Sequence, residues 1–270
     1  MANEIINQLR TFLFTQRTLR QSGKTTDIQK NIERIIGVAK TNNMFFRANR
    51  QNLTNGWKNG WYVTQGDDPR KNTSYQAANC DNGSDLNFTF LKLGSLDKSG
   101  EKIEENGTTG KGFMYSGVMK YSPEMYGDGI FAVVVDVKPE KNAKFAFWLK
   151  NYETDVNEID VAEVFNLKIR NWFGNRLMKV VFTLHKGKSY TSGHEQIPHS
   201  VWFGQGFHVF ELERLAGKLT WRVDGFTVKT EIDPDKSVKY GVILDYEAWG
   251  SSVANPPVVS RIKEMLIYTK

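Results

Sequence analysis

The chain of 270 residues is long enough to bury a hydrophobic core, and its aromatic content of 13% excludes an intrinsically disordered composition. Its net charge of +6 comes from Lys and Arg residues scattered along the sequence, which argues against a dedicated arm for nucleic acid. A single cysteine, Cys80, excludes an intramolecular disulfide and a thiolate metal cluster.

The N-terminal residues are predicted to form two helices. Apolar residues at helical spacing follow Thr26 and Asp27, which are residue types that cap helix N-termini. We expect an αα-hairpin of residues 3–22 and 27–41 within an N-terminal arm of residues 1–43. Its apolar faces either cover the main domain or dock another protein chain and mediate oligomerisation. We expect no secretory signal and no membrane span, because the sequence shows neither pattern.

From residue 44 onward, short segments rich in β-branched and aromatic residues alternate with turn residues. Examples are GIFAVVVDVKP, KFAFWLK, LMKVVFTLHKG and YGVILDYEAWG. Because no helical stretches separate these segments, we predict an all-β domain over residues 44–270, built as a β-sandwich. Residues 66–85 and 97–111 are rich in Asn, Gly and Ser and are expected to form exposed loops.

The segment NEIDVAEVF contains three closely spaced acidic residues. Glu158 and Asp160 share one face of a strand because side chains alternate, and a β-bulge at Val161 or Ala162 would return Glu163 to that face. Retaining glycosidases use two carboxyl groups about 5–5.5 Å apart, one as nucleophile and one as acid. The three acids are therefore candidate catalytic residues. A solvated strand with three surface acids is the alternative.

The sequence around these acids resembles glycoside hydrolase family 16, the laminarinases, agarases and carrageenases. The stretch from Glu158 to Glu163 matches the bulged family signature Glu-(Ile/Leu/Val)-Asp-x-x-Glu. Further segments similar to family strands follow in the same order over residues 45–270; they include YSGVMKYSPEMYGDGIFAVVVDVKP, KFAFWLK, GFHVFELERLAGKLTWRVDG and RIKEMLIYTK. The resemblance implies a concanavalin A-like jelly roll and a retaining endo-glycoside hydrolase that acts on a polysaccharide.

The resemblance also implies roles for single residues. Glu158 would be the nucleophile, Glu163 the general acid/base and Asp160 the assisting carboxylate. Aromatic side chains can stack on sugar rings, and polar side chains can bind sugar hydroxyl groups. The candidate substrate-binding residues are Trp148, Tyr152, His185, Trp172, Trp202 and Lys144. Because the sequence has no Cys or His cluster, we expect no catalytic metal and no cofactor.

Three positions depart from the family pattern. Lys144 and Arg214 each stand where family members often carry a Trp, and Lys263 stands where some members have an Asp linked with structural calcium. These departures weaken a β-1,3-glucan assignment and argue against bound calcium. The two cations fit an acidic or sulfated substrate, which is a hypothesis.

Two other interpretations stay open. A non-catalytic glycan-binding or structural module on the same fold would bind a glycan without turning it over. The chain could also belong to a larger particle, for instance as a virion-borne depolymerase that is released by lysis and acts on an extracellular or surface glycan. Residues 1–43 would then be its anchor.

Overall fold

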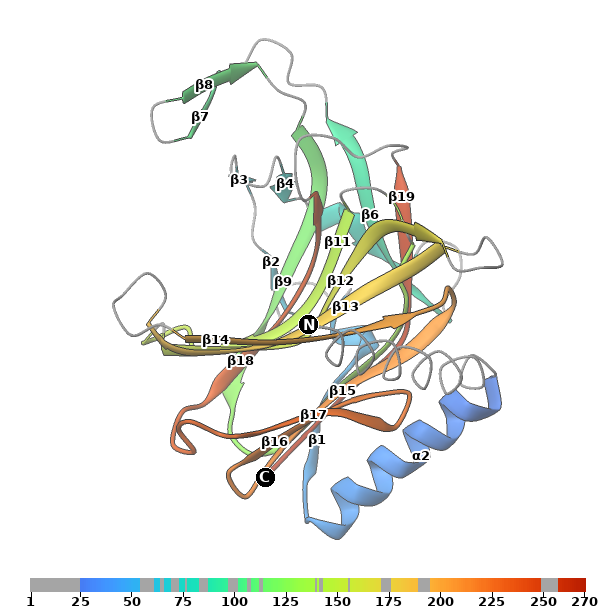
Figure 1. The fold of residues 1–270 in the computed structure, drawn as a ribbon, viewed down its shortest axis with the longest axis vertical. Helices are drawn as coiled ribbons and strands as arrows, with labels where there is room; N and C mark the ends of the chain where they lie inside the picture. The colour runs from blue at the N-terminus through green and yellow to red at the C-terminus, as the bar shows by residue number, and fades with distance from the viewer. Residues whose placement is uncertain are drawn as a thin grey trace, which may run out of the picture.

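The described residues fold mainly into two antiparallel β-sheets packed face to face, with the helix α2 (Thr25–Thr41) on the outside (Figure 1). The computed structural model describes residues 25–53, 61–63, 66–68, 73–75, 77–82, 87–96, 102–105, 108–111, 114–138, 140, 143–154, 156–170, 176–188, 195–248 and 257–270. The predicted helix 3–22 lies outside these residues. Within them, no helix is long and apolar enough to cross a membrane.

Sheet A has the order β17-β16-β15-β10-β19, and β19 pairs with β1 along one half and with β6 along the other. Its strands are β1 (Phe45–Asn49), β5 (Cys80–Asp81), β6 (Thr89–Leu96), β10 (Gly129–Asp136), β15 (Phe207–Leu215), β16 (Lys218–Val223), β17 (Phe226–Ile232) and β19 (Val258–Thr269). The 3-10 turn η1 (Arg50–Leu53) follows β1.

Sheet B has the order β14-β13-β12-β11-β18-β9, with the short β2 beside β9. Its strands are β2 (Tyr62–Val63), β9 (Met114–Tyr126), β11 (Ala143–Lys150), β12 (Val156–Arg170), β13 (Arg176–Lys188), β14 (Glu195–Phe203) and β18 (Tyr240–Ala248). The expected β-sandwich is therefore present.

The segments expected to be loops contain more regular structure than their composition indicates. They hold β3 (Gly66–Asp68), β4 (Thr73–Tyr75), the turn η3 (Ala77–Asn79), and the hairpin of β7 (Lys102–Glu105) and β8 (Thr108–Lys111). The expectation was wrong because strand formation here depends on partners: β4 runs parallel to β9, and β3 pairs with β4. Backbone pairing outweighs the weak β-propensity of these residues.

A continuous hydrophobic core fills the space between the two sheets. Its largest fully buried side chains include Phe131, Phe147, Phe182, Phe210 and Trp221. Apolar residues alternate along most strands of sheet B, so the opposite face of that sheet is left for polar side chains. That face carries the acidic residues.

The helix α2 (Thr25–Thr41) confirms the predicted second helix and packs on the outside of sheet A (Figure 1). Its buried residues Ile28 and Ile35 contact a cluster that contains Ile130, Ala132 and Val134 of β10. This explains why β10 is apolar at nearly every position: one face contacts the sandwich core and the other contacts α2. The apolar face of α2 covers its own domain, so this helix gives no support to docking on another chain.

Candidate active site

A one-residue bulge in β12 separates Asp160 from Glu163. Going from Glu163 to Asp160 takes three steps along β12, but the opposite residues on β11, Ala146 and Trp148, are two steps apart. Val161 is the residue without a register partner on β11, and the pairing with β13 shifts at the same place. The predicted bulge is therefore confirmed.

The bulge restores the alternation that brings the three acids to one face of sheet B. Ile159 and Val164 point into the core between the sheets, as predicted, with 0% and 1% of their surface exposed. Glu158 and Glu163 are half-buried and Asp160 is buried. The row is therefore partly withdrawn from water, in contrast to the solvated strand considered as an alternative.

His185 of β13 lies opposite Glu158 and joins two of the acids. Its Nε2 atom is 3.0 Å from Oδ2 of Asp160 and 3.6 Å from Oε1 of Glu158. On the other side, Nζ of Lys150 is 3.9 Å from Oε2 of Glu158. The sequence predicted that His185 lies near the nucleophile candidate, and the structure places it there.

Glu158, Asp160 and His185 each offer one ligand atom within 4.8 Å of the others, a spacing that would suit a metal ion. The hydrogen bond between His185 and Asp160 already accounts for the positions of these two groups. The expectation that the site works without a metal stays a prediction.

The environment of Glu158 and Asp160 favours protonated carboxyl groups. Burial, together with the negative charge of Glu163, raises the pKa of Asp160 to about 7. Burial also raises the pKa of Glu158, although the charges of His185 and Lys150 oppose the shift. Burial alone would lower the pKa of His185, but the hydrogen bond to Asp160 and the negative charges of Asp160, Glu158 and Glu163 together outweigh it and raise that pKa. The row can therefore hold a proton near neutral pH.

Lys144 of β11 is buried and paired with acids. Its Nζ atom is 2.9 Å from Oε1 of Glu247 and 3.2 Å from Oε1 of Glu163. Burial alone would lower the pKa of Lys144, but the carboxylates of Asp245, Glu247 and Glu163 outweigh it and raise that pKa. The hydroxyl group of Tyr75 donates to the other oxygen of Glu247. Lys144 therefore contacts the acidic row, as a residue of the site would.

Trp148 lies opposite Asp160 across β11 and β12. The ring is half-buried, and its Nε1–H donates to Oδ2 of Asp245 at 2.8 Å. This hydrogen bond fixes the indole beside the acids. The sequence prediction that Trp148 borders the site is consistent with this position.

Sequence reasoning missed several residues of this face. Asp245 and Glu247 of β18 and Lys150 of β11 contact predicted residues, and Tyr75 of β4 contacts Glu247. The alternating acids in YGVILDYEAWG were a usable signal, because residues two apart on a strand share a face. That β18 lies beside β11 could not be read from the pattern.

Three further substrate-binding candidates were predicted from the sequence. Tyr152 is 40% exposed in the turn after β11, and its hydroxyl donates to the main-chain oxygen of Val242 at 3.3 Å. Trp172 lies outside the described residues. Trp202 belongs to β14, opposite Lys179, and its side chain lies outside the described part of the chain.

Arg214 is fully buried in sheet A and cannot contact a glycan from there. Its Nε atom is 2.6 Å from Oδ2 of Asp233, and its guanidinium lies 4.8 Å from the ring centroid of Tyr240. The idea that this cation selects an anionic substrate was wrong, because the side chain is part of the domain interior.

Comparison with solved structures places the architecture among known enzymes. The laminarinase catalytic domain from Thermotoga maritima matches 84% of this chain and 98% of its own, with a TM-score of 0.59 and 15% identity. The kappa-carrageenase from Pseudoalteromonas carrageenovora matches 84% of this chain and 95% of its own, with a TM-score of 0.61 and 14% identity. A non-specific endo-β-1,3(4)-glucanase from family 16 matches 84% and 95%, with a TM-score of 0.59 and 14% identity.

The fold is the jelly-roll β-sandwich that these structures share. The predicted fold class is thereby confirmed. No protein-family model and no curated protein matches the sequence. At identities near 15%, the likeness shows the fold, and the chemistry has to be argued from the site itself.

Proposed function

We propose that the protein is a retaining endo-glycoside hydrolase that cleaves a polysaccharide through a covalent glycosyl-enzyme intermediate. The observation that carries the proposal is the bulged acidic row, in which Glu158, Asp160 and Glu163 share one face of sheet B within a partly buried, hydrogen-bonded setting. Several carboxylates gathered in this way raise one another's pKa. Glycoside hydrolysis uses such a pair as nucleophile and general acid/base.

The surroundings of each acid support distinct roles. Burial raises the pKa of Glu158, and the positive charges of Lys150 and His185 oppose that shift and so favour the ionised carboxylate that a nucleophile needs. Asp160 holds a proton near neutral pH and is hydrogen-bonded to His185, so it can assist the nucleophile without adding a full negative charge.

Glu163 would act as acid in the first step and as base in the second. Formation of the covalent intermediate neutralises Glu158 and removes one negative charge from the row. In the second step the carboxylate of Glu163, which Lys144 contacts, accepts a proton from the water that attacks the anomeric carbon, and the bond to Glu158 breaks.

The excess of negative charge at the site limits which sugar units can bind at the point of cleavage. The hypothesis of an acidic or sulfated glycan depended on Lys144 and Arg214, and both are paired with carboxylates inside the protein. We therefore propose an uncharged sugar unit at the point of cleavage, since a sulfate beside the acidic row would be repelled. Turnover of sulfated and neutral chains at equal rates would contradict this part of the proposal.

The test is incubation with a panel of neutral and sulfated polysaccharides, followed by product sizing and by NMR of the first anomer released. Oligosaccharides of intermediate size with retained configuration are expected. Azide added to Glu158→Ala should yield a glycosyl azide of inverted configuration, and azide added to Glu163→Ala one of retained configuration. Inverted products from the unchanged protein would contradict a retaining mechanism. Glycan binding without any turnover would favour the non-catalytic module.

A further inference from the structure

The bulge in β12 is contacted from the opposite sheet. Trp221 of β16 is fully buried, and its Nε1–H donates to the main-chain oxygen of Asp160 at 2.8 Å. Asp160 is the residue at which the pairing with both neighbouring strands shifts. A bulge disrupts the local ladder of hydrogen bonds, and a buried carbonyl group needs a donor. The indole of Trp221, which can only donate, supplies it across the core.

Lys229 of β17 is the cross-strand partner of Trp221 and contributes a second donor. Its Nζ atom lies 4.8 Å from the centroid of the Trp221 ring and 3.5 Å from the main-chain oxygen of Phe182. Phe182 lies on β13 between the two residues that pair with Asp160 and Glu163. One cross-strand pair of sheet A thus reaches a carbonyl group on each of the two strands at the bulge.

We infer that Trp221 and Lys229 are positioning residues that hold the bulge and thereby set Glu163 relative to Glu158. Without the extra residue at Val161, a strand that alternates strictly would point Glu163 toward the core. The strand β12 therefore has two competing registers at this point, one with the bulge and one without it. The two donors from sheet A match the carbonyl positions of the bulged arrangement and favour it.

This inference rests on the proposed function, because its kinetic consequence requires turnover. Carboxyl groups that act together must be held within about 0.5 Å of their productive positions. A displacement of about 1 Å can reduce the rate by about 100-fold. Loss of the Trp221 donor should therefore lower kcat and leave substrate binding largely intact.

The experiment replaces Trp221 by benzothienylalanine, which keeps the size of the indole and lacks the N–H group, and compares it with Trp221→Phe. Trp61→Phe is the matched control, because Trp61 is also buried in the core between the sheets. We expect both replacements of Trp221 to lower kcat by about 10- to 100-fold with KM changed less than about twofold. Lys229→Met should give a smaller loss, because its contact with Phe182 is long.

Equal kcat for the benzothienylalanine protein and the unchanged protein would overturn the inference. So would an equal loss in Trp61→Phe, because the effect would then be general packing.

A second readout does not depend on activity. Hydrogen exchange should become faster in the segments 156–170 and 176–188 of the benzothienylalanine protein and stay unchanged there in Trp61→Phe. If the unchanged protein turns over no polysaccharide, the proposed function fails, and hydrogen exchange alone decides whether Trp221 holds the bulge. Unchanged exchange in both segments would refute the positioning role.

Discussion

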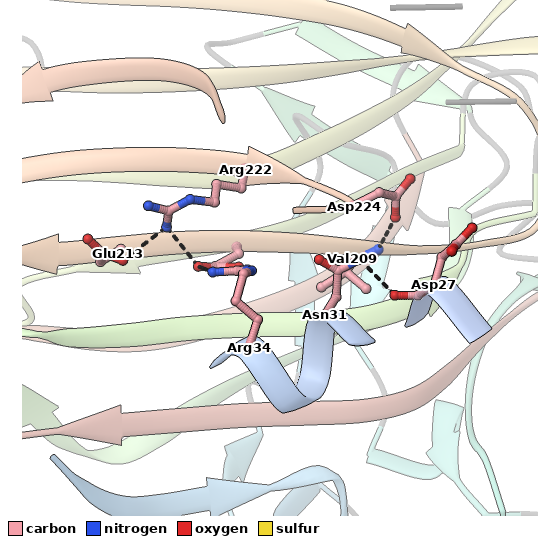
Figure 2. A network of polar contacts seen from close by, with 8 residues as sticks. Asp27, Asn31, Arg34, Val209, Glu213, Arg222 and Asp224 are labelled. Carbon is pink, nitrogen blue, oxygen red and sulfur yellow. Dashed lines mark hydrogen bonds and ion pairs between the residues drawn. The ribbon is translucent and has the colours of Figure 1, made fainter. Parts of the chain in front are cut away.

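Among the described residues, a cluster of charged side chains between α2 and sheet A and a cluster on sheet B are built differently. Under α2, Glu211 is fully buried and accepts hydrogen bonds from Arg34 and Arg222. Arg222 also donates to Glu213 (Figure 2). Among the described residues, this cluster joins two carboxylates with two guanidinium groups. Each charge has an opposite partner, as in an ion-pair network that ties a helix to a sheet.

The cluster on sheet B has more negative than positive charge. Within the described part of the chain, it brings together five carboxylates, two lysines and one histidine. They are Glu158, Asp160, Glu163, Asp245, Glu247, Lys144, Lys150 and His185. The excess of carboxylates contributes to the raised pKa of Asp160. Balanced pairs stabilise the fold, whereas unbalanced acids cost stability and supply groups that can exchange protons.

The largest expected effect is a difference in activity between variants of the two clusters. Glu163→Gln should reduce the rate of product release by about 1,000-fold or more, because it removes the proton donor and acceptor of both steps. Glu211→Gln should leave the rate per folded molecule unchanged. Reducing-sugar assays, normalised by the folded fraction, measure both. Equal losses in the two variants would contradict the division between the clusters.

Stability should show the opposite order. Glu211→Gln leaves Arg34 and Arg222 without their buried carboxylate, so it should lower the free energy of unfolding by about 2–3 kcal/mol. Glu213→Gln is the control, with an expected loss below about 1 kcal/mol. Its side chain is partly exposed and supplies only one of the two carboxylates that Arg222 contacts. Urea unfolding monitored by fluorescence measures the difference.

Asp160→Asn should stabilise the protein at alkaline pH. Burial and Glu163 raise the pKa of Asp160 to about 7, so the folded protein binds this proton more tightly than the unfolded chain. The resulting stabilisation is complete at acidic pH, below the unfolded pKa, and is lost as the pH rises through about 7. Asn mimics the neutral acid. It should therefore add about 1–2 kcal/mol to the free energy of unfolding at pH 8 and nearly nothing at pH 4. The gain at pH 8 is modest because the hydrogen bond to His185 offsets part of the cost of burying the ionised Asp160.

A gain of the same size at both pH values in urea unfolding would show that charge is not the cause. The variant should nevertheless lose activity, because the assisting carboxylate is gone.

The smallest expected effect concerns metal. Treatment with a chelator, followed by dialysis, should leave turnover unchanged, because the hydrogen bond between His185 and Asp160 already organises the only described group of candidate ligands. Product release before and after treatment, with added zinc as a further arm, tests this. A loss that zinc restores would assign a metal to Glu158, Asp160 and His185.

Much of the site was predictable because it lies within one strand. The spacing of Glu158, Asp160 and Glu163 required one bulge to bring them to one face, and the structure has it at Val161. His185 and Trp148 lie on the two neighbouring strands, and the family resemblance located them. The partners on β18 and β4 were not predictable, because no local pattern states which distant strands become neighbours.

The all-β class, the helix near residues 27–41 and the acidic row follow from the sequence alone, since each depends on periodicity within a short segment. Tertiary structure decided where the charges act. Lys144 and Arg214 look alike in sequence as cations, but one pairs with the acidic row and the other is buried with Asp233. It also decided that α2 covers its own sheet and that Trp221 reaches Asp160 across the core. Such contacts depend on which strands and faces meet, and no local pattern encodes that.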